Sequence, residues 1–190
     1  MDYPAEEKYQ RMIRAYKRLK KLATNAGKNA VIGSPDARDA TDAFFLLCYH
    51  LKDHLKKDVS IKRPQDVEDH INKSKALSRA ADLCNSSKHA GLNKPPRSGD
   101  LLDDINMAYT LHVPAGGSAK VKLNKQPRDG DTLTVVRVPV PRGTKAKSWA
   151  TAKVILTIGS KQYDALDLAT ECVRDWDAFL TTHGLVYKKS

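Results

Sequence analysis

The 190-residue chain lacks most of the features that assign a protein to a functional class at sight. No run approaches the roughly 20 apolar residues of a membrane-spanning helix. The three cysteines, Cys48, Cys84 and Cys172, lie too far apart for a zinc knuckle, and their odd number argues against a disulfide framework. We expect buried free thiols. Aromatic residues make up 6% of the chain, which disfavours any function built on base-stacking platforms.

Acidic residues are also scarce relative to basic ones. Lys and Arg number 33 against 22 Asp and Glu, for a net charge of +11. This balance favours an anionic partner, whether a nucleic acid, a phosphate-bearing ligand or an acidic protein. The segment Met1–Glu7 is acidic and polar where a signal peptide would be basic and then apolar, so we expect a cytoplasmic protein.

The first half of the chain has helical periodicity. Apolar residues recur at helical spacing over residues 5–24. Ser34-Pro35-Asp36 is a typical helix start, and the helix that it opens is expected to reach about Lys57. A short helix is expected from Pro64, and another from about Ser74 to Gly91. The Pro- and Gly-containing run of residues 93–100 then marks a change of architecture.

After that run, apolar and polar residues alternate, which predicts strands. The expected strands cover residues 106–113, 120–124, 132–140, 154–158 and 161–163, with a bulge at Val135-Val136 where the alternation slips. Their spacing is typical of an antiparallel meander. A last helix, capped by Asp164 and ending at Gly184, carries a strong apolar stripe.

These elements predict an α+β fold. Residues 1–92 form a helical bundle, residues 93–163 an inserted antiparallel sheet of four or five strands, and residues 164–190 a helix that returns to the bundle, followed by a short tail. The helix over residues 5–24 also has a basic side, which includes Arg11, Arg14, Arg18 and Lys21. That side is either a solvated surface or a nucleic-acid-binding face, because almost no acidic residue follows Glu7.

Catalytic chemistry has to come from the six histidines, because the chain has no phosphate-binding Gly loop, serine elbow or paired CxxC motif. On the helix that ends near Gly91, a stripe of short polar groups takes the place of the usual Lys and Glu. It comprises Asp82, Asn85, Ser86 and His89, with Ser78 at its edge.

Three interpretations of this stripe stay open. His50 and His54 could bind zinc with His89 as a third ligand. Alternatively, His89 could act as a general acid or base without metal, with Asn85 and Lys88 stabilising a phosphate, which would suit RNA cleavage by the 2′-hydroxyl. Finally, His50, Asp82, Asn85 and His89 could form a structural network between two helices. We favour a metal-free and cofactor-free site.

The segment Asn85-Ser86-Ser87-Lys88-His89, near the end of a helix in a bundle, resembles the motif of the HEPN-like families. The resemblance covers only the helices. It implies a dimeric, metal-independent ribonuclease of a toxin or defence system, with an Arg-polar-x(n)-His motif. The chain departs from this motif because no arginine stands beside Asn85, and Arg79 is too distant in sequence. The pattern around Cys48–Asp53 and Asp82–Asn85 also looks like an uncharacterised bacterial family of similar length.

The sequence therefore supports two functions. The first is an RNA-binding or RNA-cleaving protein of HEPN-like type, with RNA favoured over DNA and with His89, Asn85, Lys88 and His50 at the catalytic site. The second is a non-catalytic interaction module, a component of a larger bacterial or phage assembly, whose basic surface binds an acidic protein.

Overall fold

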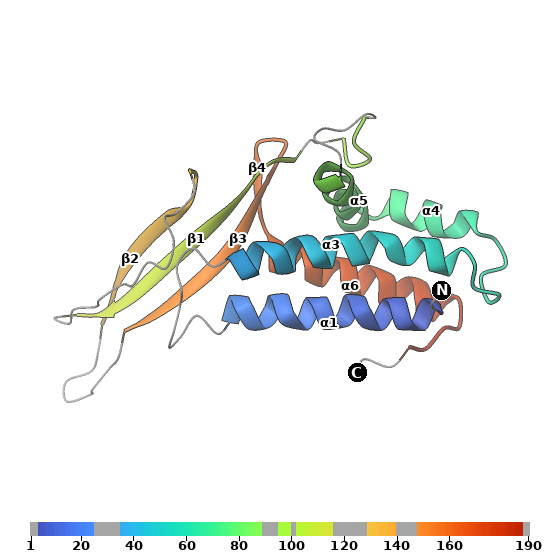
Figure 1. Ribbon diagram of the computed structural model, residues 1–190, viewed down its shortest axis with the longest axis horizontal. Helices are drawn as coiled ribbons and strands as arrows, with labels where there is room; N and C mark the ends of the chain where they lie inside the picture. Colours follow the sequence, from blue (N-terminus) through green and yellow to red (C-terminus); the bar gives the residue numbers. More distant parts are fainter. Residues whose placement is uncertain are drawn as a thin grey trace.

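The computed structural model describes residues 4–24, 35–88, 95–99, 102–115, 129–139 and 148–187. The described residues form five helices and a four-stranded sheet, in agreement with the expected α+β fold, and Figure 1 shows their arrangement. The helices are α1 (Ala5–Thr24), α3 (Pro35–Leu55), α4 (Gln65–Lys73), α5 (Lys75–Lys88) and α6 (Ala165–Thr182). The strands are β1 (Leu102–Pro114), β2 (Thr132–Val138), β3 (Trp149–Ile158) and β4 (Lys161–Asp164).

The helix boundaries follow local sequence signals closely. Helix α3 begins at Pro35, as predicted. Asp164 caps α6 by accepting a hydrogen bond from the Leu166 amide at 2.9 Å. Gly184 follows that helix with a φ of 70°, a backbone conformation that side chains disfavour. The predicted caps at Ser34 and Gly91 lie outside the described residues.

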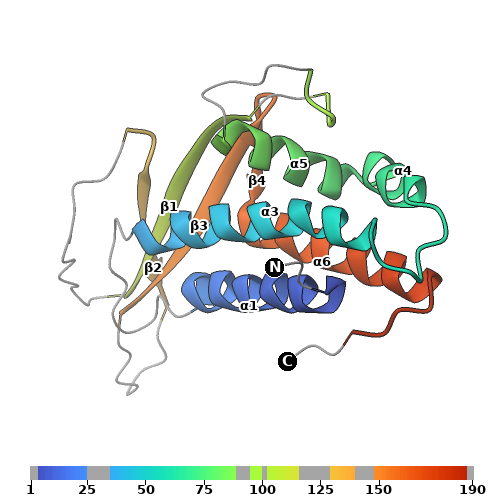
Figure 2. The ribbon, with the colours of Figure 1, turned by 45° about the vertical axis from the view of Figure 1, so that its right-hand side comes forward.

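Helices α1, α3 and α6 lie side by side, and the sheet stands at one end of this layer (Figures 1 and 2). Helix α1 ends at the sheet, whereas α3 and α6 begin there. Helix α5 packs against α3, α4 and α6. No described helix is both long enough and apolar enough to span a membrane.

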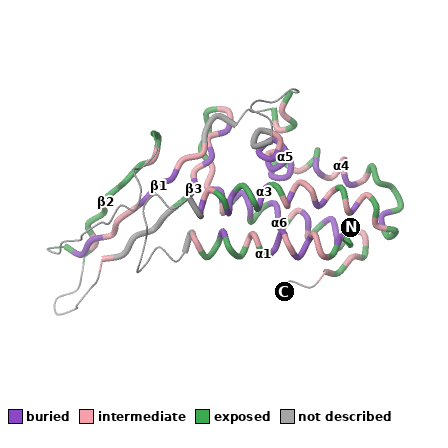
Figure 3. The backbone as a smooth tube through the Cα atoms, viewed as in Figure 1, coloured by how far each residue is buried: buried purple, intermediate pink, exposed green. Residues whose placement is uncertain are grey.

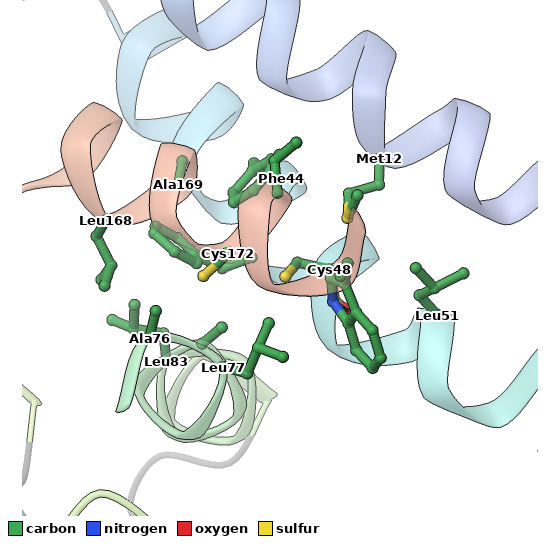
Figure 4. Close-up of a cluster of buried hydrophobic side chains, with 14 of the residues drawn as sticks. Met12, Phe44, Cys48, Leu51, Ala76, Leu77, Leu83, Leu168, Ala169 and Cys172 are labelled. Atoms are coloured by element: carbon green, nitrogen blue, oxygen red, sulfur yellow. Dashed lines mark hydrogen bonds between the residues drawn. The ribbon is translucent and has the colours of Figure 1, made fainter. Parts of the chain in front are cut away.

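The hydrophobic core lies between these helices, and Figure 3 colours its buried residues purple. Figure 4 shows Cys48 of α3 beside Cys172 of α6, with Leu77 of α5 below them. Trp176, fully buried on α6, donates its indole N–H to the Cys48 carbonyl at 3.2 Å. All three cysteines are buried thiols outside any disulfide, as expected. The same cluster takes in Met107, Tyr109 and Leu156 of the sheet, so helices and strands share it.

The sheet is mixed, which corrects the expectation of an antiparallel meander. Its order is β2-β1-β3-β4, and β1 pairs with β3, and β3 with β4, in antiparallel fashion. Strand β2 instead runs parallel to β1, with Tyr109 opposite Leu133 and Val113 opposite Arg137. The interval of residues 115–131 is long enough for the crossover that a parallel pair needs. The strand predicted at residues 120–124 lies within this interval, outside the described residues.

The bulge predicted at Val135-Val136 is also wrong, because the β1–β2 register runs unbroken through both residues. The two valines are apolar in succession because β2 is exposed on both faces, so burial does not impose alternation. The preceding Asp129-Gly130 turn is tightly constrained. Gly130 has a φ of 88°, and a Cβ there would lie 2.5 Å from Oδ1 of Asn106.

A buried ion pair joins α3 to the sheet. Arg38 donates to the Ile105 carbonyl at 2.9 Å and binds the carboxylate of Asp131, which also accepts the Met107 amide at 2.8 Å. The Asp131 side chain is only 3% exposed. Because a buried carboxylate requires such partners, this contact fixes where α3 meets the beginning of β2.

Candidate nucleic-acid interface

The four predicted nucleic-acid-binding residues lie on one side of α1. Arg11, Arg14, Arg18 and Lys21 are separated by three, four and three residues, which places them in one stripe of a helix. Arg14, Arg18 and Lys21 are exposed, and the Arg11 side chain is 35% exposed. The opposite side of α1, which includes Met12 and Leu19, is buried in the core. The stripe therefore faces away from the bundle.

The positive charge of α1 is concentrated in its second half. Glu7 pairs with the first two arginines, at 3.0 Å from Arg11 Nε and 3.2 Å from Arg14 Nη2. Within the described part of the chain, Arg18 and Lys21 form no ion pair. No acidic residue occurs in the sequence between Glu7 and Asp36. The last turns of α1 therefore present an exposed cationic surface.

A second charged group lies between α3, α4 and the segment after α5. We call it the Glu68 cluster, and it consists of Glu68, Lys52, Lys56, Arg97 and Tyr49. The Glu68 carboxylate accepts hydrogen bonds from Lys56, from Lys52 at 3.4 Å and from Arg97 at 2.8 Å. Lys52 Nζ and the Arg97 guanidinium also lie over the Tyr49 ring, 4.3 and 5.7 Å from its centroid.

The cluster strongly favours the ionised form of Glu68. Burial by itself would raise the pKa of this carboxyl, but the hydrogen bonds from Lys56 and Arg97 and the charge of Lys52 outweigh burial and lower the pKa to about 2. The three cations converge on one carboxylate that is 16% exposed. An incoming anion would have to compete with Glu68 for them, so the cluster is foremost a link between elements.

Asp82, at the centre of the predicted polar stripe, belongs to the same link. It is 3% exposed, and its two carboxylate oxygens accept the backbone amides of Arg97 and Ser98, each at 2.8 Å. Asp82 thereby holds the segment that brings Arg97 to Glu68. Ser78, at the edge of the stripe, is also buried and donates to the Ile71 carbonyl at 2.9 Å. Asp82 and Ser78 of the polar stripe therefore have structural roles.

The remaining candidate catalytic residues are only partly described. Asn85 is half-buried on α5. Lys88 is the last residue of α5, and its side chain and the whole of His89 lie outside the described residues. His50 lies on α3 with its Nδ1 3.0 Å from Oδ2 of Asp53, one helical turn away. Whether His50 and His89 approach each other stays a prediction.

The described residues do not supply the ligands that the zinc interpretation needs. Among them, no group of three or more His, Cys, Asp or Glu side chains could hold a metal ion. His50 has Asp53 as its carboxylate neighbour. The third ligand considered from the sequence, His89, falls outside the described part of the chain.

The Glu68 cluster was not predicted from the sequence. Its members come from residues 49–56, 68 and 97, and their separation in sequence conceals the contact. One local signal was present, because Tyr49, Lys52 and Lys56 lie on one side of a helix by their spacing. Arg97 gave no signal, since it stands in a Pro-Pro-Arg-Ser-Gly segment without periodicity.

A small pocket lies at the other end of the bundle, where residues 185–187 fold back on α1. It has a volume of about 240 Å³ and is lined by Tyr9, Asp177, Leu180, Thr181, Leu185, Val186 and Tyr187. Tyr9 donates to Asp177 at 2.5 Å, and Tyr187 donates to Asp58 at 3.1 Å. Burial and these carboxylates raise the pKa values of both tyrosines well above the ordinary range. At neutral pH both are therefore hydroxyl donors that hold the tail in place.

No protein-family model matches the chain, and no significant match is found among curated proteins or solved structures.

Proposed function

We propose that this protein is a cytoplasmic RNA-binding protein that contacts the phosphate backbone through the basic stripe of α1. The observation that carries the proposal is the exposed cationic second half of α1, in a chain of net charge +11. Ten residues of helix separate Arg11 from Lys21, a rise of about 15 Å. That length spans roughly four phosphates along one strand of a helical nucleic acid.

The binding test measures affinity for a fluorescent single-stranded RNA as a function of salt. Each phosphate contact contributes about 0.7 to the slope of log K against log salt for a single strand. Replacing both Arg18 and Lys21 with Gln should therefore reduce that slope by about 1.4 and weaken binding at every salt concentration. Arg11 and Arg14 stay unchanged in this variant, because Glu7 already binds them.

A matched control removes the same charge elsewhere. Lys62 and Lys161 are exposed and lie outside α1, so changing both to Gln also lowers the net charge by two. The control should keep most of the wild-type slope. Equal effects of the two pairs would mean that only net charge matters, and salt-insensitive binding or none would end the proposal.

Cleavage is the further step that the HEPN-like resemblance implies. In this step His89 accepts the proton of a ribose 2′-hydroxyl while O2′ attacks the adjacent phosphorus. The P–O5′ bond breaks, the leaving oxygen takes up a proton, and a 2′,3′-cyclic phosphate and a 5′-hydroxyl remain. Asn85 and Lys88 stabilise the charged phosphate, and His50 is the second acid-base candidate.

The step is tested in the presence of a chelator, with His89→Ala beside the control His54→Ala. If His89 is an acid-base group, its loss removes metal-independent cleavage and leaves stability within about 1 kcal/mol. His54→Ala should retain activity. Absence of cleavage by the wild type would exclude the enzyme and leave the binding proposal standing.

A second candidate function is a non-catalytic module in a larger assembly whose basic surface binds an acidic protein. It is favoured by one observation, that Asp82 and Ser78 of the polar stripe hold structural hydrogen bonds. Under this function the Arg18/Lys21 variant loses an acidic protein partner and the wild type shows no salt-dependent affinity for RNA.

A further inference from the structure

Two of the three cysteines meet in the core, where α3 packs against α6. Cys48 lies on α3 and Cys172 on α6, and both are 0% exposed. Figure 4 shows the two side chains beside each other, and a hydrogen bond joins the two thiols. Because the cysteines belong to helices that are far apart in the sequence, only packing brings them together. The core therefore holds two oxidisable sulfur atoms next to each other.

A hydrogen bond of the next helical turn keeps the pair in place. Trp176 donates its indole N–H to the backbone carbonyl of Cys48 at 3.2 Å. Cys172 precedes Trp176 by one turn of α6 and therefore lies on the same side of that helix. A disulfide requires two cysteines whose backbones are close together. The contact between Trp176 and Cys48 holds α6 against α3 at the position of the two thiols.

The surroundings of the pair slow the reaction of its thiols. Phe44, Leu51 and Ala169 of the same apolar cluster are all buried. Burial raises the pKa of the Cys172 thiol, and the hydrogen bond with Cys48 raises that pKa further. Since the thiolate is the reactive form of cysteine, the pair reacts slowly while the core is closed. A small oxidant also reaches the buried sulfur atoms more readily than a bulky one.

We propose that Cys48 and Cys172 are a redox-sensitive latch, in which a peroxide converts the two thiols into a disulfide that ties α6 to α3. One sulfur loses its proton and attacks the O–O bond of hydrogen peroxide, which leaves a sulfenic acid and one water molecule. The second sulfur then attacks the sulfenic sulfur, so that the S–S bond forms and the S–O bond breaks. The leaving hydroxide takes up the proton of the second thiol and becomes water. Two electrons pass from the sulfur atoms to the peroxide.

The disulfide restrains a large part of the chain. Helices α4 and α5 and all four described strands lie between Cys48 and Cys172 in the sequence. Closing so long a loop lowers the entropy of the unfolded chain, and we expect the melting temperature to rise by about 10 °C. The bond also keeps α6 from separating from α3. Because the core encloses the bond, a reductant as large as glutathione reaches it only when the core opens.

The experiment treats the reduced, folded full chain with hydrogen peroxide at neutral pH, alkylates the remaining thiols, and maps the peptides by mass spectrometry. The expected product is a cross-linked pair of peptides that contain Cys48 and Cys172, with a mass lower by two hydrogen atoms than the sum of the free peptides. Cys84 should remain outside any disulfide. Calorimetry should show the higher melting temperature, and reduction of the unfolded chain followed by refolding should restore the original value.

The same treatment of the chain unfolded in urea is the control for selectivity, because all three cysteines can then pair with one another. Cys84→Ala should keep the cross-link and the rise in melting temperature, whereas Cys172→Ala should lose both. The cross-link is measured in the wild type, so the test does not depend on the folding of a variant. Absence of the cross-link, the same mixture of disulfides from folded and unfolded chains, or a cross-linked protein that melts no higher than the reduced one would each overturn the proposal.

Discussion

Replacement of Glu68 with Gln should lower stability in a strongly pH-dependent manner. The change keeps the shape of the side chain and removes its charge, so Lys52, Lys56 and Arg97 lose their common partner. A shift in the pKa of Glu68 from 4.5 to about 2 corresponds to roughly 3 kcal/mol at neutral pH, at about 1.4 kcal/mol per unit. Because Lys56 and Arg97 are each about one-third exposed, solvent screening reduces this, and we expect a loss of about 2 kcal/mol.

The sign of the pH dependence follows from the lowered pKa. A carboxyl whose pKa is lower in the folded protein contributes its stability above the unfolded pKa and loses it as the pH falls toward the folded value. The difference between wild type and Glu68→Gln should therefore be constant from pH 7 to about 5, then shrink between pH 4.5 and 2. Urea denaturation at closely spaced pH values measures this difference directly.

Glu171→Gln is the matched control, because Glu171 is exposed on α6. It should change the free energy of unfolding by less than about 0.5 kcal/mol. If Glu68→Gln cost no more than this control, or if its cost were the same at pH 3 as at pH 7, the cluster would not stabilise the fold through the charge of Glu68.

Three further substitutions test other contacts by urea or thermal denaturation. Asp82→Ala leaves two amides of the segment that it holds without their acceptor, and should cost about 2–3 kcal/mol; a loss under 0.5 kcal/mol would contradict its structural role. Arg38→Met leaves the buried Asp131 carboxylate without its cationic partner and should cost about 3 kcal/mol; an unchanged free energy of unfolding would refute the ion pair's role. Trp176→Phe removes the hydrogen-bond donor to the Cys48 carbonyl, leaves a small cavity in the core, and should cost about 2–3 kcal/mol. An unchanged free energy of unfolding would show that the core repacks there.

Local signals in the sequence were sufficient for the helices. Apolar spacing, Pro35 at a helix start and Asp164 at a cap act within a few residues of where they stand, and the structure follows them. The exposed basic side of α1 was equally readable, because a helix that buries Met12 and Leu19 must turn Arg18 and Lys21 outward.

Strand direction was not readable. Alternation identifies which residues of a strand share a face, but it is the same for parallel and antiparallel neighbours. The parallel direction of the β1–β2 pair is seen only in the tertiary structure. For the same reason the two valines at positions 135 and 136 were misinterpreted as a bulge, since a strand exposed on both faces has no pattern to keep.

The sequence by itself determined the α+β class, the positions of the described helices, and which side of α1 is charged, because each depends on neighbours within one or two turns of chain. Only the tertiary structure decided the roles of Asp82, Glu68 and Arg97. The sequence pattern of a helical carboxylate is the same whether the carboxylate binds a ligand or accepts a hydrogen bond from a distant backbone amide. What distinguishes the two is the partner brought to it through space, and that partner arrives with the packing of α3, α4 and α5.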